Sequence, residues 1–426
     1  MAAADTHRTI DAVWRIESPR IIAGIARIVR DLALAEELAQ DALVAALEQW
    51  PTSGIPDNPG AWLMASAKHR AIDHLRRSKR LEEKHEEFRY EQGQQQVPDY
   101  DSIIDDEFGD DLLRLIFATC HPVLSSDARV ALTLRFLGGL TTSEIARAYL
   151  VPEATIAQRI VRAKRTLSEN RVLFEVPRGN ELTSRLASVL EAIYLIFNEG
   201  YTATAGNDWT RPALCEDALR LGRILAELVS EEPEVHGLVS LMEIQASRSR
   251  ARLNASGEPV LILDQNRALW DQFLIRQGLA ALERAEQLGG SRGPFALQAA
   301  IAACHARALV PEKTDWERIA TLYAELAQLS PSPIVDLNRA VAIAMAFGPQ
   351  AGLALVEQLA LEPALQNYHL FPSVRGDLFM RLGRFEEARG DFERAASLTR
   401  NTRERRLLLN RAEDARVASN AQSTGE

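Results

Sequence analysis

The chain has 426 residues, enough for two to four domains and for a core that needs no disulfide or metal to hold it. Hydrophobic residues make up 46% and charged residues 25%, which excludes a largely disordered or collagen-like chain. Three scattered cysteines give no disulfide framework, and without a long apolar stretch or a secretory signal we expect a soluble cytoplasmic protein.

Helical periodicity dominates the sequence from its first residues. Apolar side chains recur at helical spacing over residues 12–30 and again over 34–50. A loop rich in proline and glycine is expected over 51–59, followed by a third helix over 60–80. Because no alternation typical of strands is sustained outside a short candidate hairpin at 258–263, the predicted fold class is all-α.

The charge distribution says more than the net charge of −10. Residues 68–80 and 159–171 are two basic islands, and residues 81–111 between them are densely acidic. The acidic stretch has too little apolar content to pack, so we expect a flexible linker over 83–110. An acidic total therefore does not exclude binding to DNA.

The segment 140–168 carries the most specific local pattern. Thr141 and Glu144 have the spacing of a capping box, in which a hydroxyl accepts an amide hydrogen bond and a glutamate reaches back. Pro152 suits the first position of the next helix, which is rich in arginine. A short helix, a tight turn and a basic second helix are typical of a DNA-binding helix-turn-helix, although an ordinary helical hairpin with a solvated basic face also fits.

Two stretches together resemble the sigma-70 family of bacterial transcription initiation factors, of the extracytoplasmic-function type. ALAEELAQDALVAALEQW followed by NPGAWLMASAKHRAIDHLRR resembles region 2 of that family, and ARVALTLRFLGGLTTSEIARAYLVPEATIAQRIVRAKRTL resembles region 4. The order, the spacing and the acidic linker match over roughly residues 10–175. The resemblance implies region 2 over 10–82 and region 4 over 111–175.

The resemblance implies polymerase and DNA contacts for region 2. Gln40 and Asp41 stand where the family contacts the clamp helices of the polymerase β′ subunit, although a plain helix surface is the alternative. The next helix would meet the −10 element, whose bases are read as single strand, and the loop 51–59 would receive a flipped base. The cations expected to hold this DNA are Lys68, Arg70, Arg76, Arg77 and Arg80.

The resemblance places region 4 on the polymerase β flap and on the −35 element. Residues near the start of a recognition helix reach base edges in the major groove, and later cations hold phosphates. The residues expected to read bases are Glu153, Thr155, Gln158 and Arg159. The residues expected to hold phosphates are Arg162, Lys164 and Arg165.

The C-terminal half resembles the long extension of one sigma subgroup. We expect a helical extension over 180–290 and tetratricopeptide-like repeats over 291–418. The end of the chain fits the pattern of small and aromatic residues that lets two helices pack closely: Gly383, Phe385, Ala388, Phe392 and Ala395. The resemblance implies that the extension regulates activity, with a protein or peptide as its possible partner. A generic helical solenoid stays open as the alternative.

Enzyme motifs are missing from the sequence: it has no phosphate loop, no HExxH, no GxSxG and no dinucleotide-binding glycine turn. The pairs Cys120-His121 and Cys304-His305 do not have the spacing of a metal site, so we expect no catalytic residues, metal or cofactor. A sigma factor is the expected function. The alternatives are a helical-repeat scaffold or a plain operator-binding regulator, neither of which needs the first basic island.

Overall fold

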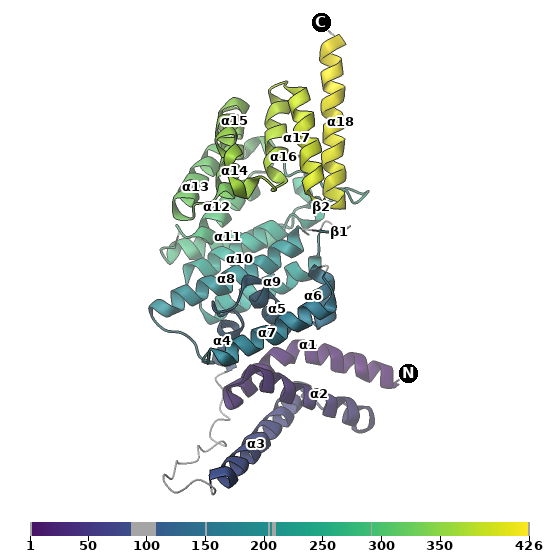
Figure 1. The fold of residues 1–426 in the computed structure, drawn as a ribbon, viewed down its shortest axis with the longest axis vertical. Helices are drawn as coiled ribbons and strands as arrows, with labels where there is room; N and C mark the ends of the chain where they lie inside the picture. The colour runs from purple at the N-terminus through teal and green to yellow at the C-terminus, as the bar shows by residue number, and fades with distance from the viewer. Residues whose placement is uncertain are drawn as a thin grey trace. The chain divides into compact units, whose positions relative to one another are not determined.

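The computed structural model describes residues 2–86, 108–149, 151–202, 205–206, 210–290 and 292–424. Its described elements are helices, apart from the strands β1 (Ala205–Gly206) and β2 (Arg400–Asn401), which form a short parallel pair (Figure 1). The predicted all-α class is therefore confirmed. The chain divides into two compact units, Met1–Ile193 and Tyr194–Glu426.

The first unit begins with three helices that pack on one another: α1 (Ala2–Val29), α2 (Leu32–Ser53) and α3 (Pro59–Glu86). Their shared core includes the fully buried Ile25, Trp50 and Leu63. Trp62 packs edge-on against Trp50, with ring centroids 5.4 Å apart. A tryptophan in such a contact serves the core.

The loop expected over 51–59 is shorter than predicted, because α2 continues through Pro51 to Ser53. The hydroxyls of Thr52 and Ser53 both donate to the carbonyl of Gln49, which holds this last turn together. Gly54 then adopts φ 84°, a conformation that glycine takes without strain, and ends the helix. Only residues 54–58 remain as the connection to α3.

Four further helices complete most of the first unit: α4 (Phe108–Thr119), α5 (Ser126–Phe136), α6 (Thr142–Tyr149) and α7 (Glu153–Glu169). The helix α5 packs on α6 and α7, and α4 packs on α1. Pro152 is the N-cap of α7 and not its first residue, a shift of one position from the prediction. The acidic linker predicted over 83–110 lies mainly outside the described residues, since 83–86 end α3 and 108–110 begin α4.

The helix α8 (Asn180–Tyr201) begins in the first unit and ends in the second. In the first unit its Arg185 donates to the carbonyl of Phe117 at 3.0 Å, and its Glu191 pairs with Arg129 of α5 at 2.9 Å. The start of α8 is thus attached to α4 and α5. This matters for any truncation, because a cut before α8 would remove part of the first unit.

The second unit continues with α9 (Pro212–Leu228), α10 (Pro233–Ala246), η2 (Ser249–Ala251), η3 (Arg267–Leu269), α11 (Gln272–Gln287), α12 (Pro294–Arg307) and η4 (Pro311–Lys313). The helix α10 is buried along most of its length and packs against α9, α11 and α12. Arg267 donates to the carbonyls of His305 and Ala308, and so satisfies the C-terminal end of α12.

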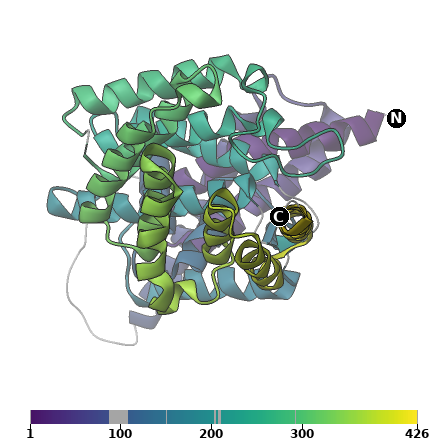
Figure 2. The same cartoon turned by 90° about the horizontal axis from the view of Figure 1, so that it is seen from above.

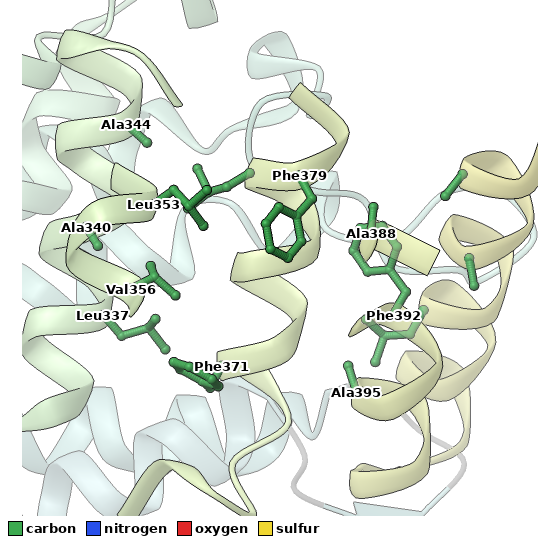
Figure 3. Packing of buried hydrophobic residues seen from close by; sticks show 14 of the residues in the cluster. Leu337, Ala340, Ala344, Leu353, Val356, Phe371, Phe379, Ala388, Phe392 and Ala395 are labelled. Atoms are coloured by element: carbon green, nitrogen blue, oxygen red, sulfur yellow. The ribbon is translucent and has the colours of Figure 1, made fainter. Parts of the chain in front are cut away.

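The rest of the second unit is a series of sequential helices that pack pairwise: α13 (Trp316–Leu329), α14 (Pro333–Phe347), α15 (Pro349–Gln358), η5 (Leu359–Leu361), η6 (Pro363–Leu365), α16 (Leu370–Arg381), α17 (Phe385–Leu398) and α18 (Thr402–Thr424). Figure 2 looks nearly along α18, beside which α17 packs. Ala388, Phe392 and Ala395 are completely buried, as the sequence pattern predicts, and Phe392 belongs to one core with Leu353 and Phe371 (Figure 3).

Over the described residues, no helix combines the length and the apolar character that crossing a membrane requires.

Candidate nucleic-acid interface

The helix-turn-helix of the first unit is formed by α6 and α7. The amide of Thr141 donates to Glu144 Oε2 at 2.8 Å, and the amide of Glu144 donates to Thr141 Oγ1 at 3.2 Å, so the predicted capping box is confirmed. Arg15 of α1 also contacts Glu144, at 2.7 Å. Burial alone would raise the pKa of Glu144, but the hydrogen bonds from Thr141 and the charge of Arg15 outweigh it and lower the pKa.

The recognition helix α7 has a buried face and an open face. Ile156, Ile160, Ala163 and Leu167 are buried at the spacing expected of one side of a helix. The open face is exposed and carries five of the residues predicted to meet DNA: Glu153, Thr155, Gln158, Arg162 and Arg165. This face can offer carboxylate, hydroxyl, amide and guanidinium groups to a major groove.

Several cations of α7 contact carboxylates. Arg159, expected to read a base, is half-buried and contacts Asp127 of α5 at 2.9 Å. Arg165 contacts Glu169 one turn away at 2.6 Å, and this pair is exposed. The helix therefore turns part of its predicted DNA-binding charge toward the protein.

The most buried of these ion pairs involves Glu36 of α2. Its carboxylate is 9% exposed and contacts Arg135 of α5 at 2.8 Å and Lys164 of α7 at 2.5 Å. Gln40, one turn further along α2, donates to the same carboxylate at 3.1 Å. We call Glu36, Gln40, Arg135 and Lys164 the Glu36 cluster. The cluster joins three helices. Within it, the ammonium group of Lys164, which was predicted to hold a DNA phosphate, is paired with Glu36.

The predicted −10 contacts lie along α3. Arg76, Arg77 and Arg80 are exposed and, at spacings of three and four residues, share one side of the helix. Lys68 and Arg70 are half-buried. This side of α3 presents a row of guanidinium groups suited to phosphates.

The two predicted polymerase contacts are neighbours on α2. Gln40 and Asp41 are both exposed, although the amide of Gln40 also reaches Glu36. The Asp41 carboxylate lies 4.0 Å from the guanidinium of Arg70 on α3. A surface that would bind polymerase therefore adjoins both sets of predicted DNA contacts.

Two residues of this region were not predicted. Val161 is 63% exposed on the open face of α7, out of phase with Ile156 and Ile160, and that phase could have identified it. Its methyl groups suit contact with a thymine methyl. Glu36 had no local signal, because Arg135 and Lys164 lie 99 and 128 residues away in the sequence.

Within the described ranges, no group of three or more histidine, cysteine, aspartate or glutamate side chains could hold a metal ion. Cys120 is buried, with its Sγ 3.2 Å from the hydroxyl of Thr133, and burial raises the pKa of its thiol. It behaves as a small core residue.

Comparisons with known proteins identify the same two regions of the chain. Family models match sigma-70 region 2 over residues 14–81 and sigma-70 region 4 over residues 114–167. The chain is 30% identical over 154 residues to the ECF RNA polymerase sigma factor SigK of Mycobacterium ulcerans (strain Agy99), which covers 35% of this chain and 78% of that protein. The chain belongs to the extracytoplasmic-function sigma factors of the sigma-70 family.

This sigma factor carries more than its two sigma regions. Residues 185–286 match a family of unknown function, DUF6596. Over 396 residues the sigma factor is 42% identical to an uncharacterised protein of Rhizobium meliloti (strain 1021), covering 93% of each chain. Among solved structures, yeast Tom70 aligns with a TM-score of 0.32 and 13% identity, over 98% of this chain and 86% of that one. The sigma regions and the extra C-terminal part predicted from the sequence are both present.

Proposed function

We propose that this sigma factor binds core RNA polymerase in the cytoplasm and directs transcription initiation from promoters that it recognises at −35 and −10. The observation that carries this proposal is the open face of α7, where polar and basic side chains stand opposite a buried apolar face. A helix of this kind, presented by a capped helix-turn-helix, suits a major groove. Initiation here needs no catalytic residue of the sigma factor, because binding energy drives promoter opening.

Each part of α7 has a separate role in this proposal. Glu153, Thr155 and Gln158 lie in its first two turns, where a recognition helix approaches base edges. Arg162 and Arg165 lie further along and hold phosphates, which supplies affinity and register but not sequence preference. Arg159 and Lys164 join them when they exchange Asp127 and Glu36 for phosphate or base.

The helix α3 would hold the −10 element. Its exposed row of Arg76, Arg77 and Arg80 supplies charge for a separated strand, and Lys68 and Arg70 extend that charge along the helix. The short connection 54–58 would form the pocket for a flipped base. Melting then draws on contacts that the single strand makes and the duplex does not.

Gln40 and Asp41 would bind the clamp helices of the polymerase β′ subunit, while region 4 would bind the β flap. Both side chains are exposed, and Gln40 shares the Glu36 carboxylate with Lys164. A polymerase that draws the Gln40 amide away from Glu36 would remove one donor from the carboxylate that also pairs with Lys164. The predicted polymerase contact and a predicted DNA-binding cation therefore share one carboxylate.

The extension beyond the sigma regions would regulate activity through a protein or peptide partner. It occupies more of the chain than the two sigma regions together, and its helices form a continuous packed series from α9 to α18. Sequential helix pairs of this kind often present a surface for another chain.

In vitro transcription with bacterial core polymerase and the DNA upstream of the protein's own coding sequence tests the proposal. The full-length chain should give transcripts with a defined start. Arg162→Ala should weaken promoter binding by the holoenzyme on every sequence, while Arg276→Ala, an exposed arginine on α11, serves as the matched control. A chain that binds duplex DNA but not core polymerase would instead be an operator-binding regulator.

The role of the extension is tested by a truncation after Tyr201. This boundary keeps the whole of α8, whose Arg185 and Glu191 contact α4 and α5. Circular dichroism checks that the shortened chain is folded. A higher transcript yield from the shortened chain would show that the extension inhibits, and a lower yield would show that it activates. An unchanged yield at all concentrations of core polymerase would contradict a regulatory role.

A further inference from the structure

A cavity of about 590 Å³ in the first unit is not explained by polymerase or promoter contacts. It lies where α1 ends and α2 begins, beside α4 and the segment that follows α7. Its charged lining is formed by Arg27, Arg30, Arg114 and Arg171 with Asp31 and Glu175. We call it the arginine cavity. A second cavity of about 710 Å³ adjoins it at Arg114 and Glu175 and adds both Arg178 and Glu181.

The arginine cavity carries an excess of positive charge. Four guanidinium groups line it, against the two carboxylates of Asp31 and Glu175 and the buried carboxylate of Asp111, which pairs with Arg27 and Arg114. Asp31 already accepts the amide of Leu34 at 2.9 Å as the N-cap of α2. Asp111, which is buried, contacts Arg114 at 2.8 Å and Arg27 at 3.4 Å, and so fixes those two guanidinium groups. Fixed arginines bind anions well because little rotamer freedom is lost on binding.

The other two arginines have an unusual backbone. Among the described residues, Arg30 (φ 54°) and Arg171 (φ 49°) are the non-glycine residues with positive φ, and both line this cavity. Each stands just after a helix, at a position where glycine is normally preferred. An arginine at such a position is strained, and strain of this kind concentrates at functional sites. Both side chains are exposed, so their charge is accessible to a ligand.

One wall of the cavity is apolar. Leu167 is buried, Phe174 is half-buried and Leu173 is 64% exposed. The cavity surface therefore has an apolar part, formed by an exposed leucine and an aromatic ring, beside a positively charged part formed by guanidinium groups. Phosphates suit the arginines, since a guanidinium donates two parallel hydrogen bonds to a phosphate. A flat heterocycle suits the ring and the leucine.

We infer that the arginine cavity binds a nucleoside polyphosphate, with its phosphates on Arg30, Arg171, Arg27 and Arg114 and its base against Phe174. The volume lies in the range of ordinary small-molecule sites. Arg27 and Arg30 belong to the region 2 part of the unit, and Arg114 and Arg171 to the region 4 part or its end. The nucleotide therefore joins the two sigma regions and stabilises the arrangement in which Lys164 is paired with Glu36. The site does not depend on the proposed promoter contacts.

Calorimetric titration of the full chain with ATP at fixed ionic strength tests this inference, with pyrophosphate and adenosine as comparison ligands. The double variant Arg30→Gly and Arg171→Gly removes two charges and also relieves the backbone strain, since glycine prefers this conformation. We expect it to raise the Kd for ATP at least about tenfold while its melting temperature stays equal or rises. Arg20→Gln, an exposed position on α1 paired with Glu17, is the matched control and should leave the Kd unchanged.

The apolar wall is tested separately. Phe174→Ala should weaken ATP binding by about tenfold and leave pyrophosphate binding unchanged, as loss of a stacking contact predicts. Pyrophosphate that binds wild type as tightly as ATP would overturn the base contact. ATP binding that does not saturate, or that is equal in the double glycine variant and wild type, would overturn the site.

Discussion

The helices α3 and α7 were both predicted to hold DNA through rows of basic residues, but the structure treats the two rows differently. On α3, Arg76, Arg77 and Arg80 lie exposed on one side of the helix. On α7, Arg159 and Lys164 turn toward carboxylates of other helices, and Arg165 contacts a carboxylate on its own helix. Sequence charge is thus a good guide to a DNA surface only where tertiary partners leave it at the surface.

The difference also gives the two helices different starting states for promoter binding. In the proposed function, the exposed α3 row would meet phosphates directly. The α7 row must first give up Asp127 and Glu36, and the second of these is the costlier exchange because Glu36 is buried. Promoter contacts at −10 and −35 should therefore respond differently to substitution.

The largest effect is expected from the double variant Arg76→Ala and Arg77→Ala on α3. Loss of two phosphate contacts should reduce the slope of log affinity against log salt by about two and weaken promoter binding by the holoenzyme by about 100-fold. Filter binding over a series of salt concentrations measures both. An unchanged slope would mean that α3 does not hold DNA and would remove the contrast with α7.

Glu36→Gln should have the next largest effect. The variant leaves Arg135 and Lys164 without their carboxylate, so we expect a loss of about 2 kcal/mol in the free energy of unfolding. The affinity of the free chain for −35 duplex should rise, because Lys164 becomes available. Urea unfolding and fluorescence anisotropy measure the two effects, and the neighbouring exposed Glu37→Gln is the control. Lower DNA affinity in the Glu36 variant would contradict the role given to this cluster.

Thr141→Ala tests the capping box of α6, the helix that precedes α7 in the helix-turn-helix. Loss of the N-cap hydroxyl of α6 should lower the free energy of unfolding by about 1 kcal/mol.

The partner Glu144 adds a pH dependence to this stability. Because the pKa of Glu144 is lowered in the folded state, its contribution is fully present above the unfolded pKa and is lost as pH falls through the folded pKa. Thermal unfolding of wild type and Glu144→Gln should therefore differ at neutral pH and converge in acid. A constant difference at all pH values would contradict the capping role of the carboxylate.

The smallest effect on stability is expected from Arg165→Gln, because its pair with Glu169 is fully exposed and screened by solvent. Denaturant midpoints of wild type and variant should coincide. The salt slope of −35 binding should nevertheless fall by about one, since exchange of Glu169 for a phosphate costs little. A stability loss as large as that of Glu36→Gln would mean that burial does not determine how much each of the two ion pairs contributes to the free energy of unfolding.

The elements that depend on neighbouring residues could be predicted from the sequence. Helical spacing of apolar residues indicated the helices near the start of the chain, and the Thr141 and Glu144 pair indicated the start of α6. The predicted loop before α3 is too long because proline usually ends a helix, whereas the hydroxyls of the two residues after Pro51 extend the last turn of α2. Local hydrogen bonds and helical periodicity depend on residues that are close together in the sequence, so they can be predicted without knowledge of the fold.

Tertiary packing sets which charged side chains meet. Glu36 finds Arg135 and Lys164 across more than ninety residues, and Arg30 and Arg171 come to line one cavity although each follows a different helix. An arginine side chain has many rotamers and pairs with whichever carboxylate packing brings near, so its partner is set by the fold and not by its neighbours in the sequence. For that reason the fold class and the recognition helix were predictable, whereas the Glu36 cluster and the arginine cavity were not.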